Sequence, residues 1–254
     1  MLLTRMGQVA GLMLIVSGLV TGTAAQTEPV RVLSSVAVKA VIDALAPEFE
    51  QSTKRTVTPA FGIAAAIKAN IEGGEPFDVA ILTPAMLDDL AAKGLIDAAA
   101  RPVVARAGLG VMVKAGARKP DLSSVDAFKR TMLAARAVTY VPTGASGVLF
   151  LATLEKLGIA DAVKAKAKPA ASGDDVNTNI TSGTADLAVL PVSEILPVRG
   201  AELGGVFPAG IQSYIVMAAG INPRSPRAAA ARDFVAFLTS AKNTPVITAK
   251  GMER

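Results

Sequence analysis

The 254-residue sequence contains no cysteine, no histidine and no tryptophan, and only 4% of its residues are aromatic. Without cysteine there is no disulfide, so packing alone must stabilise the fold. Without histidine the commonest general base and the commonest transition-metal ligand are both missing, which excludes zinc hydrolases and histidine-dependent catalytic triads. We expect neither a resident metal nor a cofactor.

Long apolar runs and basic clusters are scarce as well. The net charge is +5, but Lys and Arg are scattered along the chain, which does not favour binding to nucleic acid. Residues 1–25 are typical of a secretory signal peptide, with Arg5, a short apolar run and small residues at a cleavage site. An uncleaved N-terminal anchor is the alternative, although the apolar run is short and broken by glycine. We expect export to a bacterial periplasm.

Strand and helix signals alternate through the rest of the chain. The segment after the first strand places Val38, Val41, Ile42, Leu45 and Phe49 on one face of a helix. Residues 164–168 are expected to form a charged linker. Strands are expected at residues 30–33, 56–61, 77–82, 109–114, 137–141, 187–190 and 213–218. This alternation predicts an α/β fold with a mainly parallel, doubly wound sheet flanked by helices.

Two pairs of segments repeat each other in the same order. "NIEGGEPFDVAILTP" at 70–84 matches "NITSGTADLAVLPV" at 179–192, and "LSSVAVKAV" has a strand-loop-helix counterpart in "YVPTGASGVLFL". The repeats predict two similarly built lobes, and the strands near 109–114 and 212–218 are the candidates to cross between them. Lobe one would comprise residues 26–109 and 209–254, and lobe two residues 110–208.

The loops that close the first strand and its counterpart carry small and hydroxylated residues. In open α/β sheets, ligands bind beyond the carboxyl ends of the strands, where helix N-termini present unpaired N–H groups. Facing each other across a cleft, the two loops would bind a small anion or polar solute. For each serine, an ordinary helix N-cap is the alternative. The residues are Ser34, Ser35, Thr143, Gly144, Ser146 and Gly147.

Several other polar residues have two interpretations. Asp78 and Asp186 precede matched strands, which favours a structural role at the entry ends of the strands over a catalytic carboxylate pair. Asp174 and Asp175 fit helix capping better than the edge of a cleft. Tyr214, like the nearby Gln212, lies on a crossing strand, where contact with a ligand and packing at a hinge remain equal alternatives.

The whole chain after residue 25 resembles the periplasmic molybdate-binding proteins of ABC importers. The similarity is carried by "VRVLSSVAVKAVIDALAPEFEQST", "IEGGEPFDVAI", "GVMVKAG", "LEKLGIADAV" and "LAVLPVSEIL", of which "IEGGEPFDVAI" is the most specific. The resemblance implies the two-lobed periplasmic binding protein fold, with two crossing strands and an anion held between the lobes. It also implies delivery of that anion to an ABC permease in the inner membrane.

The ligand contacts of that family carry over incompletely. By resemblance, its two loop serines fall on Ala37 and on Ala64 or Ala65, its second-lobe contacts on Ser146 and Val176, and its tyrosine on Pro191. Three hydroxyl donors are therefore absent, and each loss costs on the order of 1.5–3 kcal/mol for a desolvated anion. Candidates to compensate are Ser34, Ser35, Thr83 and Thr143. We expect a small anion, either molybdate or tungstate or, preferably, an organic carboxylate.

Two other functional classes compete with a monomeric receptor that closes over a solute. A periplasmic α/β hydrolase would have to use carboxylate catalysis by Asp78 or Asp174, because "TGASGV" around Ser146 lacks the first glycine of a nucleophile elbow and no histidine can activate the serine. An adhesin-like envelope protein would show exposed repeats, which the sequence lacks.

Overall fold

A computed structural model describes residues 28–254, and the expected signal peptide therefore lies outside the described residues. Nine strands are present in this part of the chain. They are β1 (Val30–Ser35), β2 (Val57–Gly62), β3 (Val79–Leu82), β4 (Val103–Lys114), β5 (Val138–Tyr140), β6 (Ala167–Pro169), β7 (Leu187–Pro191), β8 (Ala201–Val206) and β9 (Tyr214–Ile221).

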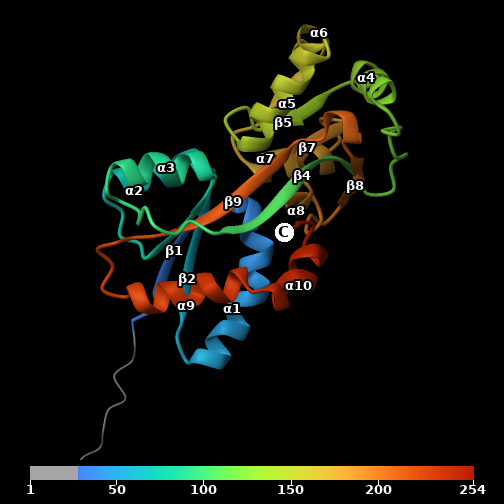
Figure 1. Ribbon diagram of the computed structural model, residues 1–254. Helices are drawn as coiled ribbons and strands as arrows, with labels where there is room; N and C mark the ends of the chain where they lie inside the picture. The colour runs from blue at the N-terminus through green and yellow to red at the C-terminus, as the bar shows by residue number, and fades with distance from the viewer. Residues whose placement is uncertain (1–27) are drawn as a thin grey trace, which may run out of the picture.

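The strands form two sheets that share the long strand β4 (Figure 1). The first half of β4 pairs with β9, in the sheet ordered β2-β1-β3-β9-β4. Its second half pairs with β7 and β8, in the sheet that continues through β5 to β6. β4 therefore crosses from one lobe to the other, and it begins at Val103 rather than at Leu109 as the sequence indicated.

The predicted repeat corresponds to matching strand orders. In the first sheet β2, β1 and β3 are parallel neighbours, and in the second β6, β5 and β7 are parallel neighbours. β3 and β7 are buried along their whole length, as expected of parallel strands covered on both faces. The two lobes thus share one topology, which confirms the prediction of similarly built α/β halves.

Helices cover both faces of each sheet (Figure 1). In the first lobe α1, α9 and α10 pack on one face of the sheet and α2 and α3 on the other. In the second lobe α4, α5 and α6 contribute to one hydrophobic cluster against the sheet, and α7 and α8 contribute to a second hydrophobic cluster. The helices are η1 (Val36–Val38), α1 (Lys39–Thr53), α2 (Ala64–Glu72), α3 (Pro84–Ala92), α4 (Val125–Ala134), α5 (Ala145–Lys156), α6 (Ala160–Lys164), α7 (Gly173–Thr181), α8 (Val192–Ile195), η2 (Ala209–Ile211), α9 (Ala228–Thr239), η3 (Ala241–Asn243) and α10 (Thr244–Ala249).

Two regions differ from the sequence prediction. The expected charged linker contains the end of α6 and the short edge strand β6, which is held by pairing with β5. β8 was not predicted, because Gly204 and Gly205 are unusual in strands. Pairing with β4 across a bulge defines β8, and a Cβ on Gly204 would lie only 2.9 Å from Cδ of Pro120.

The two repeated aspartates tie neighbouring strands together at their entry ends. Asp78 is fully buried and accepts hydrogen bonds from the Arg31 amide (2.7 Å), Ser225 Oγ (2.5 Å) and Arg227 Nε (2.8 Å). Burial alone would raise the pKa of Asp78, but these three donors outweigh burial and lower it. In the second lobe Asp186 accepts from the amide and guanidinium of Arg136. The structural interpretation of both residues is confirmed.

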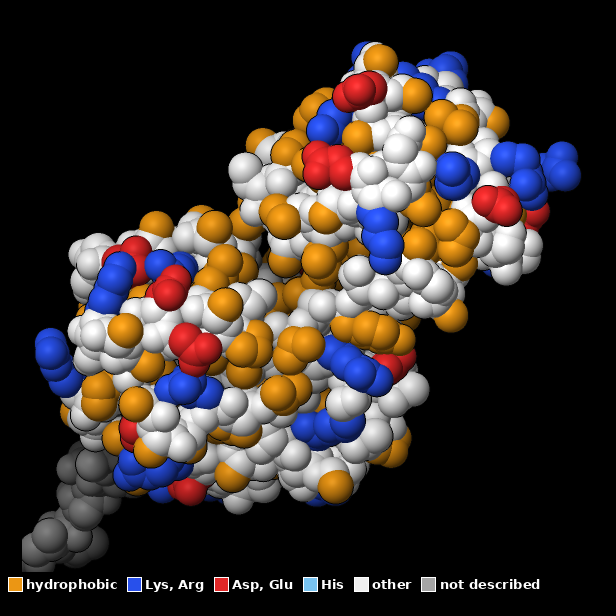
Figure 2. All heavy atoms as spheres, turned by 45° about the horizontal axis from the view of Figure 1, so that its top comes forward, with side chains coloured by type: hydrophobic (Ala, Val, Ile, Leu, Met, Phe, Trp, Pro, Cys, Tyr) orange, Lys and Arg blue, Asp and Glu red, His pale blue; other side chains and the backbone are white. Residues whose placement is uncertain are grey.

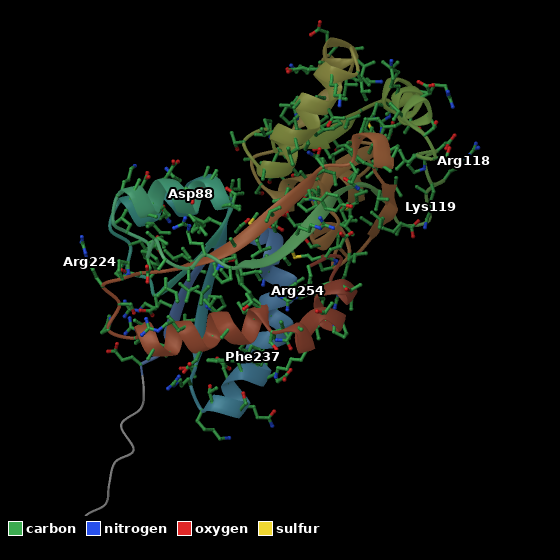
Figure 3. The ribbon with its side chains drawn as sticks, viewed as in Figure 1. Asp88, Arg118, Lys119, Arg224, Phe237 and Arg254 are labelled. Carbon is green, nitrogen blue, oxygen red and sulfur yellow. The ribbon has the colours of Figure 1, made fainter. Side chains whose placement is uncertain are left out.

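Basic side chains are spread over the surface. Figure 3 shows Arg118 and Lys119 on the loop after β4 at one side of the molecule and Arg224 at the opposite side. Within residues 28–254, no helix is both long enough and apolar enough to cross a membrane.

Candidate ligand-binding cleft

A small central cavity lies between the two lobes. Figure 2 shows the narrow waist between them, where hydrophobic side chains gather. The cavity has a volume of about 40 Å³, which is room for about three water-sized groups. Ile215 and Met217 of β9 contribute to its lining. A single carboxylate or a compact oxyanion matches this size.

Six of the residues singled out in the sequence line this cavity, and they come from both lobes. From the first lobe come Ser35, Ala37 and Ala64, and from the second Gly144, Ser146 and Pro191. Ser35 and Ser146 are both buried, so a guest that reaches them is largely removed from water. The expected convergence of the two loops is therefore present in the structure.

Four more predicted residues line an adjoining apolar pocket of about 540 Å³. They are Ala65, Thr83, Thr143 and Tyr214, and Ala64 belongs to both cavities. Arg106 lies over the Tyr214 ring at 4.5 Å, so this ring also packs at the hinge. Nearby, Gln212 both donates to and accepts from the backbone of Leu109, which favours the hinge interpretation for Gln212.

Three predicted residues do not line the cavities described. Ser34 is fully buried and donates a hydrogen bond to the Ser35 carbonyl, because its position in β1 turns it into the lobe. Val176 is a fully buried core residue of α7. Gly147 packs against the preceding loop so closely that a Cβ would lie 1.9 Å from the Val141 carbonyl oxygen.

Helix N-termini surround the central cavity. α2 starts after Ile63 and α5 after Gly144, and neither has a side-chain hydrogen bond at its N-cap. Their first N–H groups therefore keep their donor capacity and the partial positive charge of the helix end. Ser35 lines the cavity and is also a helix N-cap, which was the alternative interpretation of the loop serines. Its Oγ accepts a hydrogen bond from the Ala37 amide at 3.3 Å at the start of η1.

A second pocket of about 550 Å³ shares Glu194 and Gly173 with the central cavity, and we call it the polar pocket after the charged and amide side chains in its otherwise apolar lining. Lys39 and Asp43, one turn apart on α1, form an ion pair in its lining, and Arg199 lines it after α8. Asn177 of α7 adds an Oδ1 atom that is buried and accepts no hydrogen bond from the described residues. The pocket therefore offers both charges and an unsatisfied amide to a guest.

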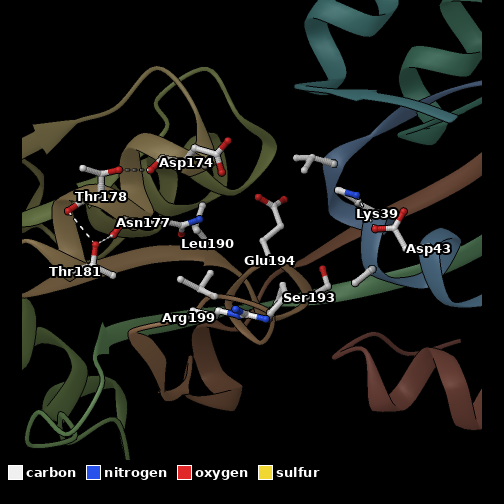
Figure 4. Close-up of a pocket in the computed structure, with 15 residues that line it drawn as sticks. Lys39, Asp43, Asp174, Asn177, Thr178, Thr181, Leu190, Ser193, Glu194 and Arg199 are labelled. Atoms are coloured by element: carbon white, nitrogen blue, oxygen red, sulfur yellow. Dashed lines mark hydrogen bonds and ion pairs between the residues drawn. The ribbon is translucent and has the colours of Figure 1, made fainter.

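Glu194 stands at the junction of the central cavity and the polar pocket. It lines both, and Figure 4 shows its carboxylate directed into the space between α1 and α7. Burial raises the pKa of Glu194 to about 7, with no compensating donor among the described residues. Sequence reasoning missed this residue. Its only signal was its position three residues after the end of β7, in a helix of four residues.

Asp174 and Asp175 at the start of α7 have different roles, one at the edge of a pocket and the other in helix capping. Asp175 forms a capping box with Ser172, in which each side chain accepts from the other residue's backbone amide. Asp174 lies at the edge of the polar pocket. The capping prediction is thus confirmed for Asp175 alone.

Comparison with known proteins agrees with this arrangement. The family described as "Bacterial extracellular solute-binding protein" matches residues 30–253. The chain belongs to this family. This solute-binding protein is 27% identical over 227 residues to an aconitate isomerase from a Pseudomonas species, covering 87% of this chain and 86% of that protein. It is 28% identical over 239 residues to the molybdate-binding protein ModA of Azotobacter vinelandii, covering 90% of this chain and 91% of that protein.

The fold is also that of known binding proteins. The solved structure of the periplasmic molybdate-binding protein of Azotobacter vinelandii superposes with a TM-score of 0.75 at 22% identity, covering 89% of this chain and 99% of that chain. The resemblance to molybdate-binding proteins and the two-lobed α/β fold are confirmed. The hydrolase alternative receives no support from these relatives.

Proposed function

We propose that this solute-binding protein is a periplasmic receptor that closes over a small anion and delivers it to an ABC permease. The observation that carries the proposal is the central cavity, where Ser35 and Ser146 from different lobes meet two uncapped helix N-termini. Backbone N–H groups at helix ends and buried hydroxyls together bind an anion without a full positive charge. We propose that lobe one, residues 26–109 and 209–254, and lobe two, residues 110–208, move relative to each other. We expect the receptor to be a monomer without a cofactor.

An organic anion fits the cleft better than molybdate or tungstate. Ala37, Ala64 and Pro191 present carbon atoms to the cavity where the resembling family has hydroxyls, so a tetrahedral oxyanion would have unsatisfied oxygens. The central cavity holds one acidic group, and the polar pocket beside it has the volume typical of a small-molecule site. The relatives include a protein named for aconitate and one named for molybdate, both anions.

Calorimetry tests the receptor function directly. The mature protein is unfolded, freed of ligand and refolded, then titrated with molybdate, tungstate, sulfate, citrate and trans-aconitate. We expect an organic carboxylate to bind most tightly, and Ser146→Ala to weaken it about tenfold, the loss of one charge-assisted hydrogen bond. The exposed Ser52→Ala is the matched control and should bind like wild type. Submicromolar binding of molybdate with weak binding of carboxylates would overturn the ligand assignment.

A second candidate function is a proton-transfer isomerase for an unsaturated carboxylate. Glu194 favours it, because a carboxyl group with a pKa of about 7 is able to accept a proton and return it near neutral pH. Interconversion of cis- and trans-aconitate, followed by proton NMR, tests this activity. Turnover that is lost in Glu194→Gln would support the isomerase, and binding without turnover supports the receptor.

A further inference from the structure

Glu194 faces the guest from a position that the fold holds firmly. It lies on α8, which follows β7 directly and is fixed by the neighbouring Ser193, whose Oγ donates to the Ala37 carbonyl at 2.8 Å. Against α7, a Cβ on Gly173 would lie 3.5 Å from Glu194 Oε2. The carboxyl group is therefore confined between the two lobes, beside both the central cavity and the polar pocket.

The charged groups around Glu194 do not hold it ionised. From α1 the pocket receives Lys39 and Asp43, from α7 Asp174, and from the segment after α8 Arg199. Lys39 is engaged with Asp43 at 2.5 Å, so these two charges largely cancel. Burial is the cause of the pKa of about 7, which leaves the free protein with a mixture of both protonation states at neutral pH.

We propose that Glu194 binds the anion in its protonated form, donating a hydrogen bond to an oxygen of the guest, so that a Glu194 that is ionised in the free protein takes up one proton when the anion binds. This inference rests on the receptor function proposed above. An ionised Glu194 would repel an anion bound beside it, and solvent screens this repulsion less at a partly buried site than at an exposed one. A protonated carboxyl instead supplies a donor close to where the resembling family's hydroxyls are replaced by carbon.

The direction of the pH dependence follows from linkage. Bound anion stabilises the protonated form, so the pKa of Glu194 is higher in the complex than its value of about 7 in the free protein. Well below pH 7 the group is protonated in both states and affinity is independent of pH. Between the two pKa values one proton is taken up on binding, and Kd rises about tenfold per pH unit.

The experiment is calorimetric titration of wild type between about pH 5.5 and pH 9, each point repeated in two buffers of different ionisation enthalpy. The probes are molybdate and sulfate, which keep their charge over this range, and trans-aconitate at the alkaline end. We expect a flat Kd at acid pH, a tenfold rise per unit above neutrality, and uptake of about one proton there. The two-buffer comparison needs no variant, so the test does not depend on the folding of one.

Variants identify the group responsible. Glu194→Gln keeps a donor and cannot titrate, so its Kd should be flat across the range and close to the acid-limb value of wild type. Asp174→Asn changes another carboxylate of the same pocket and should keep the slope of wild type. A slope that persists in Glu194→Gln, or an affinity that rises with pH, overturns the proposal. If wild type binds an anion with a Kd that does not change with pH, the proposal for Glu194 is overturned and the receptor function stands. Absence of binding to any probe at any pH overturns the receptor function itself.

Discussion

Ser193 and Ala37, which are 156 positions apart in the sequence, are joined by a buried hydrogen bond of 2.8 Å from the serine hydroxyl to the alanine carbonyl. Ser193 lies in α8 of the second lobe and Ala37 in η1 of the first, directly beside the central cavity. The bond therefore links closure of the lobes to the geometry of the site that the guest occupies.

Ser193→Ala should shift the protein toward an open state. The substitution removes one hydrogen bond and leaves a buried carbonyl without its partner, at a cost of about 1 kcal/mol, or roughly fivefold in affinity for the guest. Small-angle scattering should show a larger radius of gyration in the liganded protein, and calorimetry the weaker binding. Ser182→Ala, an exposed serine at the end of α7 in the same lobe, is the control. Unchanged scattering and affinity would show that the bond does not favour closure.

Restoring the missing hydroxyls should move specificity toward inorganic oxyanions. Ala37 and Ala64 are buried at the central cavity, so serine at either position adds a donor within reach of the guest. We expect Ala37→Ser and Ala64→Ser each to tighten molybdate binding about tenfold, and the double variant more. Ala65→Ser, which lines the apolar pocket instead, serves as the matched control. If none of the cavity variants improves molybdate binding, the cavity is not where molybdate would bind.

Removing Asp78 should destabilise the protein far more than removing its counterpart in the second lobe. Asp78→Ala removes the buried acceptor of the Arg31 amide, Ser225 Oγ and Arg227 Nε, and Arg227 keeps only its ion pair with the exposed Glu28, at a cost of about 3–5 kcal/mol. Asp186 pairs with an exposed Arg136, and Asp186→Ala should cost less than about 1 kcal/mol. Urea unfolding of both variants measures the difference. Equal losses would contradict the distinction between the two positions.

The same comparison has a pH signature. Because the folded-state pKa of Asp78 is lowered, its ionised form stabilises the native state above the unfolded pKa of about 3.9. That contribution is lost as pH falls through the lower, folded value. The stability difference between wild type and Asp78→Ala should therefore be largest near neutral pH and shrink in acid. A difference that is constant down to acid pH would rule out ionisation as its source.

Gly147→Ala tests the packing that shapes the second-lobe loop. A Cβ there would lie 1.9 Å from the Val141 carbonyl oxygen, a backbone atom that is unable to move without displacing the loop. We expect a loss of at least about 3 kcal/mol in unfolding free energy, at the severe end of overpacking. Gly73→Ala, with an ordinary helical φ of −76° and nearest contacts of 3.4 Å, should be nearly neutral. Thermal melts of the two variants give the comparison.

Sequence reasoning succeeded where local chemistry and topology agree. Ser35 and Ser146 lie at the carboxyl ends of matched strands, so both reach the central cavity between the lobes, and Asp78 and Asp186 occupy similar positions just before their strands. It failed where tertiary contacts decide. Ser34 sits one residue from Ser35 but alternation along β1 turns it inward, and nothing local to Glu194 reveals that the fold places its side chain in both cavities.

The central claim is that opposing loops of the two lobes hold one anion in a shared cavity. The most direct measurement is a crystal structure of the mature protein with the anion that calorimetry selects. We predict an acidic group of the guest between Ser35 and Ser146, within hydrogen-bond distance of the first amides of α2 or α5. A guest bound elsewhere, with water alone between these two serines, would contradict the claim.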